Sequence, residues 1–186
     1  MKYNNIREEE LKNKVAQDYF GIYDCTRIIG NVDFCVCMYQ NQKELFEQES
    51  LLWAEAKTGS SDIYKSIVQL ILTIGKARTF DNNLPPAMLG AFDGEKIAFI
   101  PYSDIRDFFY INDFNWKVTP SDYSSKEFNL IHEKVKTVID NKALLFNFLN
   151  DDQELKKFIK NNFIVGKLGF TKIKIDKNNF MVIYNK

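Results

Sequence analysis

The sequence predicts an α/β protein with a mixed central β-sheet flanked by helices, and a smaller α/β extension at its C-terminal end. The first observation is the order of elements in the first hundred residues, where amphipathic helices alternate with groups of short apolar strands. The second is that residues 31–39 are apolar at successive positions, which is typical of a strand covered on both faces. Helices on both faces of a mixed sheet account for both observations.

The first predicted helix covers residues 4–20, because Leu11, Val15 and Tyr19 recur every fourth residue. The second covers residues 62–80, with Ser60 or Ser61 as its cap. Alternation and flanking turn residues predict five strands around these helices, at residues 23–29, 31–39, 50–57, 87–93 and 96–102. Beyond residue 102 we expect two more helices and two strand-like runs, at about residues 124–141, 151–162, 170–176 and 179–185.

The composition is that of a globular protein. Hydrophobic residues make up 45% and aromatic residues 15% of the chain, which is enough for a packed core. Acidic and basic residues are balanced at 25 each, which argues against a non-specific nucleic-acid coat but allows a locally basic groove. The three cysteines suggest reduced thiols. Because there is no signal peptide and no stretch of about 18 apolar residues, we expect a cytoplasmic protein without a membrane partner.

Glu55 and Lys57 are unusual because they end an apolar run, residues 51–54. Buried charges are costly unless they are paired or bind a metal. An acidic residue two positions before a lysine is by itself a weak signal, since the chain contains four such pairs. The other three lie among polar residues of predicted helices or at their ends, where they are solvated: Glu10/Lys12, Asp140/Lys142 and Glu154/Lys156.

Asp33 is the one charged residue in the strand at 31–39. If this strand pairs with residues 50–57 around a loop centred near residue 44, Asp33 lies directly opposite Glu55, with β-carbons about 5 Å apart. Two carboxylates that close repel each other, so a positive charge between them is expected. Mg²⁺ suits two carboxylates and several waters, and alternation places Lys57 on the same face. Phosphodiester hydrolysis uses these groups.

The residues Asp33…Glu55-Ala56-Lys57 resemble the catalytic motif of the PD-(D/E)xK nuclease superfamily, with Val32 in place of the leading Pro. The resemblance implies a restriction-endonuclease-like core over residues 1–102 and an extension over residues 103–186. The sequence of the first hundred residues as a whole is similar to the N-terminal nuclease domain of single-chain restriction–modification enzymes, which carry an adenine methyltransferase downstream. No methyltransferase motif is present in this chain.

The resemblance also implies the roles of individual residues. Asp33, Glu55 and the Ala56 carbonyl would bind Mg²⁺, for which Mn²⁺ would substitute, and Lys57 would position the attacking water. Gln69 would steady Lys57 or the scissile phosphate, although Thr73 stands where one branch of the superfamily has a Tyr. Gln69 could instead satisfy a buried backbone group. An acidic residue of the first helix often joins such sites, and Glu8 is our choice because it faces the sheet.

The expected partner is double-stranded DNA, with a downstream methyltransferase and specificity region, S-adenosylmethionine if that region exists, and dimerisation for cleavage of the second strand. Lys65, Lys76 and Arg78 could contact phosphates or be solvated. The aromatic residues from Phe108 to Trp116 could stack on bases, but burial under the C-terminal helices is the favoured reading. The alternative function is a non-catalytic DNA- or protein-interaction domain on a nuclease-like scaffold.

Overall fold

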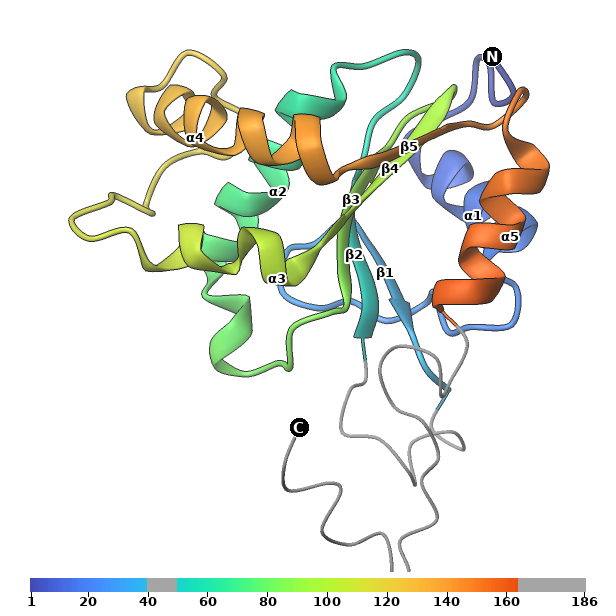
Figure 1. Cartoon of the computed structure of the whole chain (residues 1–186), viewed down its shortest axis with the longest axis horizontal. Helices are drawn as coiled ribbons and strands as arrows, with labels where there is room; N and C mark the ends of the chain where they lie inside the picture. Colours follow the sequence, from blue (N-terminus) through green and yellow to red (C-terminus); the bar gives the residue numbers. More distant parts are fainter. Residues whose placement is uncertain (40–49, 164–186) are drawn as a thin grey trace, which may run out of the picture.

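A computed structural model describes residues 1–39 and 50–163, which form an α/β structure around one mixed sheet (Figure 1). Five strands lie in the order β1-β2-β3-β4-β5. Only β2 and β3 are parallel, and the other neighbours are antiparallel. The strands are β1 Phe34–Cys37, β2 Ser50–Ala56, β3 Met88–Phe92, β4 Lys96–Pro101 and β5 Leu144–Asn147. The predicted class, a mixed sheet flanked by helices, is confirmed.

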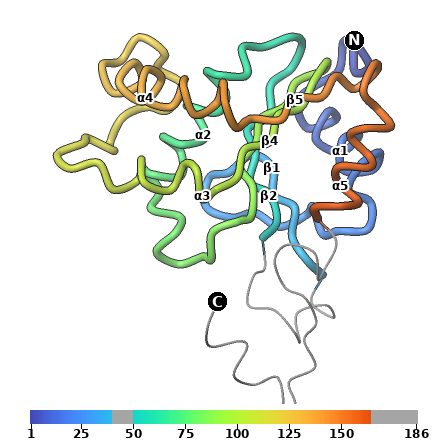
Figure 2. The backbone as a smooth tube through the Cα atoms, viewed as in Figure 1, coloured from blue at the N-terminus to red at the C-terminus, as the bar shows by residue number. Residues whose placement is uncertain are grey.

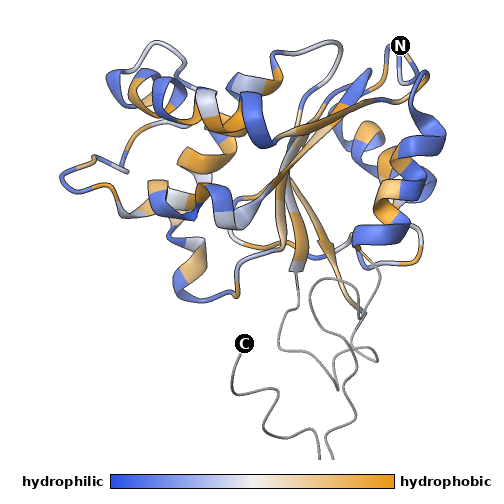
Figure 3. Cartoon of the chain, in the orientation of Figure 1, coloured by the Kyte–Doolittle hydropathy of each residue, from blue (hydrophilic) through white to orange (hydrophobic). Residues whose placement is uncertain are grey.

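The helices form a layer on each face of the sheet, as Figures 1 and 2 show. One layer contains α1 Glu8–Tyr19 and α5 Asp152–Asn162. The other contains α2 Ile63–Ala77, the short α3 Tyr102–Ile105 and α4 Lys126–Lys142. Each layer covers its own apolar cluster, and Figure 3 shows that the sheet is hydrophobic whereas the helices carry hydrophilic residues as well. Both faces of the sheet are therefore buried, which explains the continuous apolar runs in the strands.

The helices on both faces bury the residues that their periodicity predicts. Leu11, Val15 and Tyr19 are buried along α1. α2 is capped by Asp62, whose carboxylate accepts hydrogen bonds from two backbone N–H groups of the first turn, so the predicted serine cap is wrong. At its other end Arg78 takes a left-handed conformation and a 3-10 turn follows, Thr79–Asp81. The helix thus ends slightly before the predicted boundary.

The pairing of β1 with β2 follows the register that the hairpin predicts. Phe34 pairs with Ala54, and Val36 pairs with Leu52, before a shift at Cys37. One step in the other direction leads from Phe34 and Ala54 to Asp33 and Glu55. Residues 40–49 of the connection lie outside the described residues, but the register of the two strands leads toward both acids.

Residues 23–29 do not form the predicted strand. Only Asp24 forms an isolated bridge, with Cys37. The Asp24 carboxylate accepts hydrogen bonds from the backbone and hydroxyl of Thr26, and this local turn competes with sheet pairing. β5 was not predicted, and the strands expected at 170–176 and 179–185 lie outside the described residues.

Residues 103–163 pack on the same sheet as the first hundred residues. β5 pairs with β4. The apolar cluster that contains the buried residues of α2 also contains three residues of α4, Phe128, Ile131 and Val135. A 3-10 turn, Arg106–Tyr110, begins the aromatic segment. Phe109 is buried and Trp116 packs against the cluster, whereas Tyr110 is 69% exposed. Most of these aromatic residues therefore fill space between elements, and Trp116 packs on Gly75 of α2.

Candidate active site

Four of the predicted site residues converge at the end of β2. Asp33 lies just before β1, Glu55 and Lys57 are at the end of β2, and Gln69 is on α2. Asp33 Oδ2 accepts a hydrogen bond of 3.5 Å from the backbone N–H of Ala56. Lys57 Nζ lies 2.6 Å from Glu55 Oε1. The hairpin thus supplies the acids and the lysine, and α2 supplies the amide.

Glu55 is the most unusual group of the site because its side chain is only 2% exposed. Burial, followed by the negative charge of Asp33, raises the pKa of Glu55 to about 8, against the effect of Lys57. Burial also disfavours the ammonium of Lys57, but its hydrogen bond and attraction to Glu55 outweigh this and raise the pKa of Lys57. Glu55 therefore ionises with difficulty, and once ionised it keeps Lys57 protonated.

Gln69 links this pair to a residue that sequence reasoning missed. Its Nε2 donates a hydrogen bond to Glu55 Oε1. Its Oε1 accepts a hydrogen bond of 2.9 Å from the hydroxyl of Tyr123, which lies in the loop before α4. Thr73 is buried and the tyrosine that reaches Gln69 comes from elsewhere in the chain. No local pattern relates two residues that are 54 positions apart.

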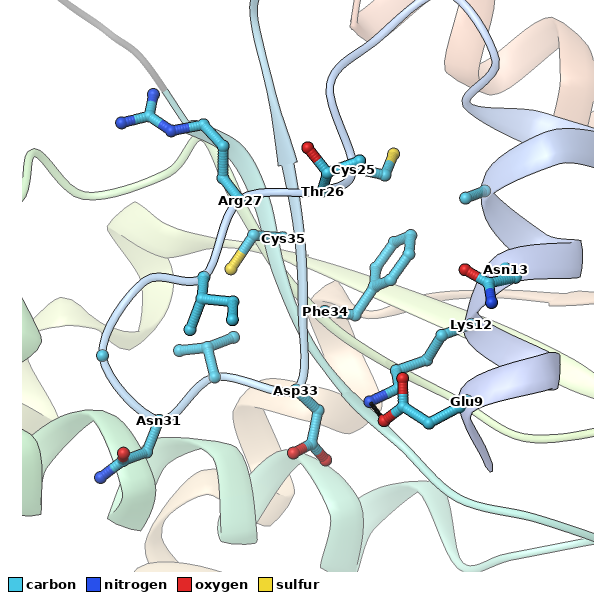
Figure 4. Close-up of a pocket in the computed structure, with 14 residues that line it drawn as sticks. Glu9, Lys12, Asn13, Cys25, Thr26, Arg27, Asn31, Asp33, Phe34 and Cys35 are labelled. Carbon is cyan, nitrogen blue, oxygen red and sulfur yellow. Dashed lines mark ion pairs between the residues drawn. The ribbon is translucent and has the colours of Figure 1, made fainter. Parts of the chain in front are cut away.

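A groove of about 600 Å³ adjoins the site on the side of α1 (Figure 4). Its lining includes Asp33, Asn31 and Arg27 from the segment before β1, and Lys12 and Glu9 from α1. Lys12 forms an ion pair with Glu9. The groove therefore has charges of both signs, and the partly exposed Asp33 connects it to the buried Glu55.

Of the other predicted site residues, the structure brings some to the site and leaves others away from it. Glu8 lies 4.0 Å from Lys12, and its neighbour Glu9, not Glu8, lines the groove with Asp33. The helical spacing could have indicated Lys12, since it lies four residues after Glu8. Lys65 is exposed near Gln69, with its ammonium 5.7 Å from the ring of Tyr123.

The remaining predicted phosphate contacts lie at the opposite end of α2 from Lys65. Lys76 is exposed in the last turn, and Arg78 is the C-cap. Arg78 Nε is 2.6 Å from Asp81, and its guanidinium lies over Phe80. The structure thus brings Lys65 to the site but not these two residues.

A divalent cation fits the chemistry of Asp33 and Glu55. Within residues 1–39 and 50–163 no three His, Cys, Asp or Glu side chains are grouped to hold a metal. Mg²⁺ does not require three, because it takes one or two carboxylates and keeps several waters. Burial, followed by the negative charge of Asp33, raises the pKa of Glu55, and a cation between the two carboxylates would favour the ionised form of Glu55.

Comparison with known proteins finds no family model, no curated protein and no solved structure that matches this chain.

Among the helices of the described residues, none is long and apolar enough to cross a membrane. The cysteines form no disulfide among the described residues. Burial raises the pKa of Cys25 and Cys35 to about 12, so these thiols are poor nucleophiles at neutral pH. Covalent chemistry through them is disfavoured.

Proposed function

We propose that this protein is a Mg²⁺-dependent endodeoxyribonuclease that hydrolyses phosphodiester bonds of double-stranded DNA. One observation carries the proposal: the register of β1 and β2 leads Asp33 toward the buried Glu55, whose carboxylate lies 2.6 Å from the Lys57 ammonium. A buried ion pair alone is weak support for a site. A second carboxylate close to it adds repulsion that burial strengthens, and a bound cation would relieve that repulsion.

Each residue has a role in this reaction. Asp33, Glu55 and the Ala56 carbonyl would hold Mg²⁺, or Mn²⁺ in its place. The bound ion supplies Lewis-acid chemistry, polarising the phosphate and favouring ionisation of the attacking water. Lys57 orients that water and offsets charge that develops on the phosphate. Gln69 fixes the Glu55 carboxylate through its amide N–H.

The resemblance of the Asp33…Glu55-Ala56-Lys57 motif extends the proposal to the nuclease module of a restriction–modification enzyme in the cytoplasm. A methyltransferase and specificity region, with S-adenosylmethionine, and a second copy for the other DNA strand would complete it. Lys65 is the basic residue best placed for a DNA phosphate, because it is exposed beside Gln69.

Cleavage of plasmid DNA by the purified chain in Mg²⁺ tests the proposal. Asp33→Ala and Lys57→Ala should each lower the rate by at least about 100-fold, because each removes a group that acts on the transition state. Lys142→Ala is the matched control, because Lys142 belongs to another acid-x-Lys pair and is exposed. Equal cleavage by the wild type, Asp33→Ala and Lys57→Ala would refute the assignment.

A non-catalytic scaffold that binds DNA or protein is the second candidate, and the formal net charge of zero favours it. Thermal unfolding with increasing Mg²⁺ or Mn²⁺ separates the two. A specific site stabilises the fold by about 2.7 kcal/mol at 100 times its Kd, or several degrees in Tm. Asp33→Ala should abolish this rise, whereas a scaffold shows no saturable effect even in the wild type.

A further inference from the structure

We propose that Tyr123 is a positioning residue of this site, so that the segment beyond residue 102 completes it. Tyr123 fixes the amide of Gln69, and through it the Glu55 carboxylate. The hydrogen bond between Tyr123 and Gln69 is part of the structure, whereas its effect on cleavage rests on the proposed nuclease function.

The hydrogen bonds of Gln69 have only one consistent arrangement. Oε1 of Glu55 already accepts a hydrogen bond from the Lys57 ammonium, so this oxygen carries no proton and Gln69 must turn its NH₂ group toward it. The Gln69 carbonyl then points the other way and needs a donor. The Tyr123 hydroxyl provides that donor at 2.9 Å. If the amide turned over, its carbonyl would face the carboxylate and lose both favourable contacts.

The ring of Tyr123 is held from several sides. Its centroid lies 4.9 Å from that of Phe128, a residue of α4 that is 2% exposed. The Lys65 ammonium lies 5.7 Å from the ring centroid. Ser125 caps α4 two residues later, and its hydroxyl accepts a hydrogen bond from the Phe128 N–H. The hydroxyl is therefore presented to Gln69 by an ordered loop, although Tyr123 itself is 39% exposed.

A chain of side chains thus runs from the loop to the buried acid. Tyr123 donates to Gln69, and Gln69 and Lys57 both donate to Oε1 of Glu55. Loss of the hydroxyl leaves the amide free to turn, and Glu55 then loses one of its two side-chain donors. The expected effect is on kcat and not on KM, since the ring and its surface remain in Tyr123→Phe.

The experiment compares Tyr123→Phe with Tyr64→Phe in the full chain. Tyr64 is the matched control, because its hydroxyl also donates to a side chain, that of Asp140 at the end of α4, away from Glu55. The first readout is NMR of the Gln69 side-chain NH₂ without metal, assigned by its loss in Gln69→Ala. The second is kcat and KM for DNA cleavage.

Tyr123→Phe should shift or broaden the Gln69 NH₂ signals and lower kcat by about 3- to 10-fold, with KM unchanged. It should lower kcat no further in the Gln69→Ala background, because the two residues act through one path. Tyr64→Phe should leave the signals and kcat unchanged.

Two results would overturn the proposal: unmoved Gln69 signals in Tyr123→Phe, or moved signals with wild-type kcat. A wild type that cuts no DNA while Tyr123→Phe still moves the Gln69 signals supports the positioning contact and rejects the nuclease function. The two failures are therefore distinguishable.

Discussion

Two buried acids lie at the ends of neighbouring parallel strands, and the groups that surround their carboxylates differ. Glu55 ends β2 and is 2% exposed, whereas Asp93 follows β3 and is fully buried. Asp93 accepts hydrogen bonds from the backbone N–H groups of Ser61, Glu95 and Lys96, at 2.7–2.9 Å. The Lys96 ammonium lies 3.4 Å away. The turn around Asp93 is thus built to neutralise it.

Within residues 1–39 and 50–163, Glu55 has no such set of backbone donors. Its donors are the side chains of Lys57 and Gln69, and Asp33 adds a second negative charge. Side chains can rearrange when a ligand arrives, whereas backbone N–H groups in a tight turn cannot. Burial of a charge therefore does not distinguish a site from a structural feature. What distinguishes Glu55 is incomplete neutralisation by groups that are free to exchange partners.

Asp93→Ala should have the largest effect on stability. It leaves three backbone N–H groups without their acceptor, and unsatisfied buried donors cost about 1–3 kcal/mol each. Because such costs are not additive, we expect a loss of about 4 kcal/mol in urea unfolding. Glu95→Ala is the control, since its carboxylate is 39% exposed and should contribute less than about 1 kcal/mol. Equal losses in the two variants would show that Asp93 is not the anchor of this turn.

The stability of the metal-free protein should depend on pH through Glu55. Its pKa rises on folding from 4.5 to about 8, so the folded state binds one more proton than the unfolded state between these values. Stability therefore falls by a few kcal/mol as pH rises from about 4.5 to about 8. Saturating Mg²⁺ should reverse the fall, because the cation favours the ionised carboxylate.

Glu55→Gln should remove this contribution from the pH dependence of urea unfolding, since an amide does not titrate. Glu154→Gln, an exposed change on α5, should retain it. Parallel curves for the wild type and Glu55→Gln would mean that Glu55 is ionised in the folded protein across this range, like an ordinary ion-pair partner.

The sequence was sufficient for the hairpin register and for the placing of Glu55 because both depend on regular periodicity. Alternation along β2 fixes the side of Glu55 and Lys57, and the position of the loop fixes Asp33. α2 brings Gln69 to the same side through the spacing of its buried residues. Features that repeat every two or 3.6 residues can be read locally.

The sequence was insufficient where a local turn or a distant contact decided the structure. Asp24 and Thr26 form a turn within a run that otherwise resembles a strand. β5 has four residues, and its Leu144 and Leu145 are exposed, so it lacks a pattern of alternating burial. Tyr123 reaches Gln69 only because α4 packs against α2, and tertiary packing of that kind leaves no trace in residue spacing.

Gly75→Ala should have the smallest effect. It tests how the segment between α3 and α4, which contributes to the site at the end of β2, packs against α2. A β-carbon at Gly75 would overlap the indole ring of Trp116. Alanine improves helix propensity by about 1 kcal/mol, but displacing the ring costs about 1–3 kcal/mol, so we expect a net loss of about 1 kcal/mol. The measurement is urea unfolding of Gly75→Ala in the wild type and in Trp116→Ala. With the indole gone only the propensity gain remains, and the change should become stabilising. Destabilisation of the same size in both backgrounds would show that Trp116 does not set the requirement for glycine.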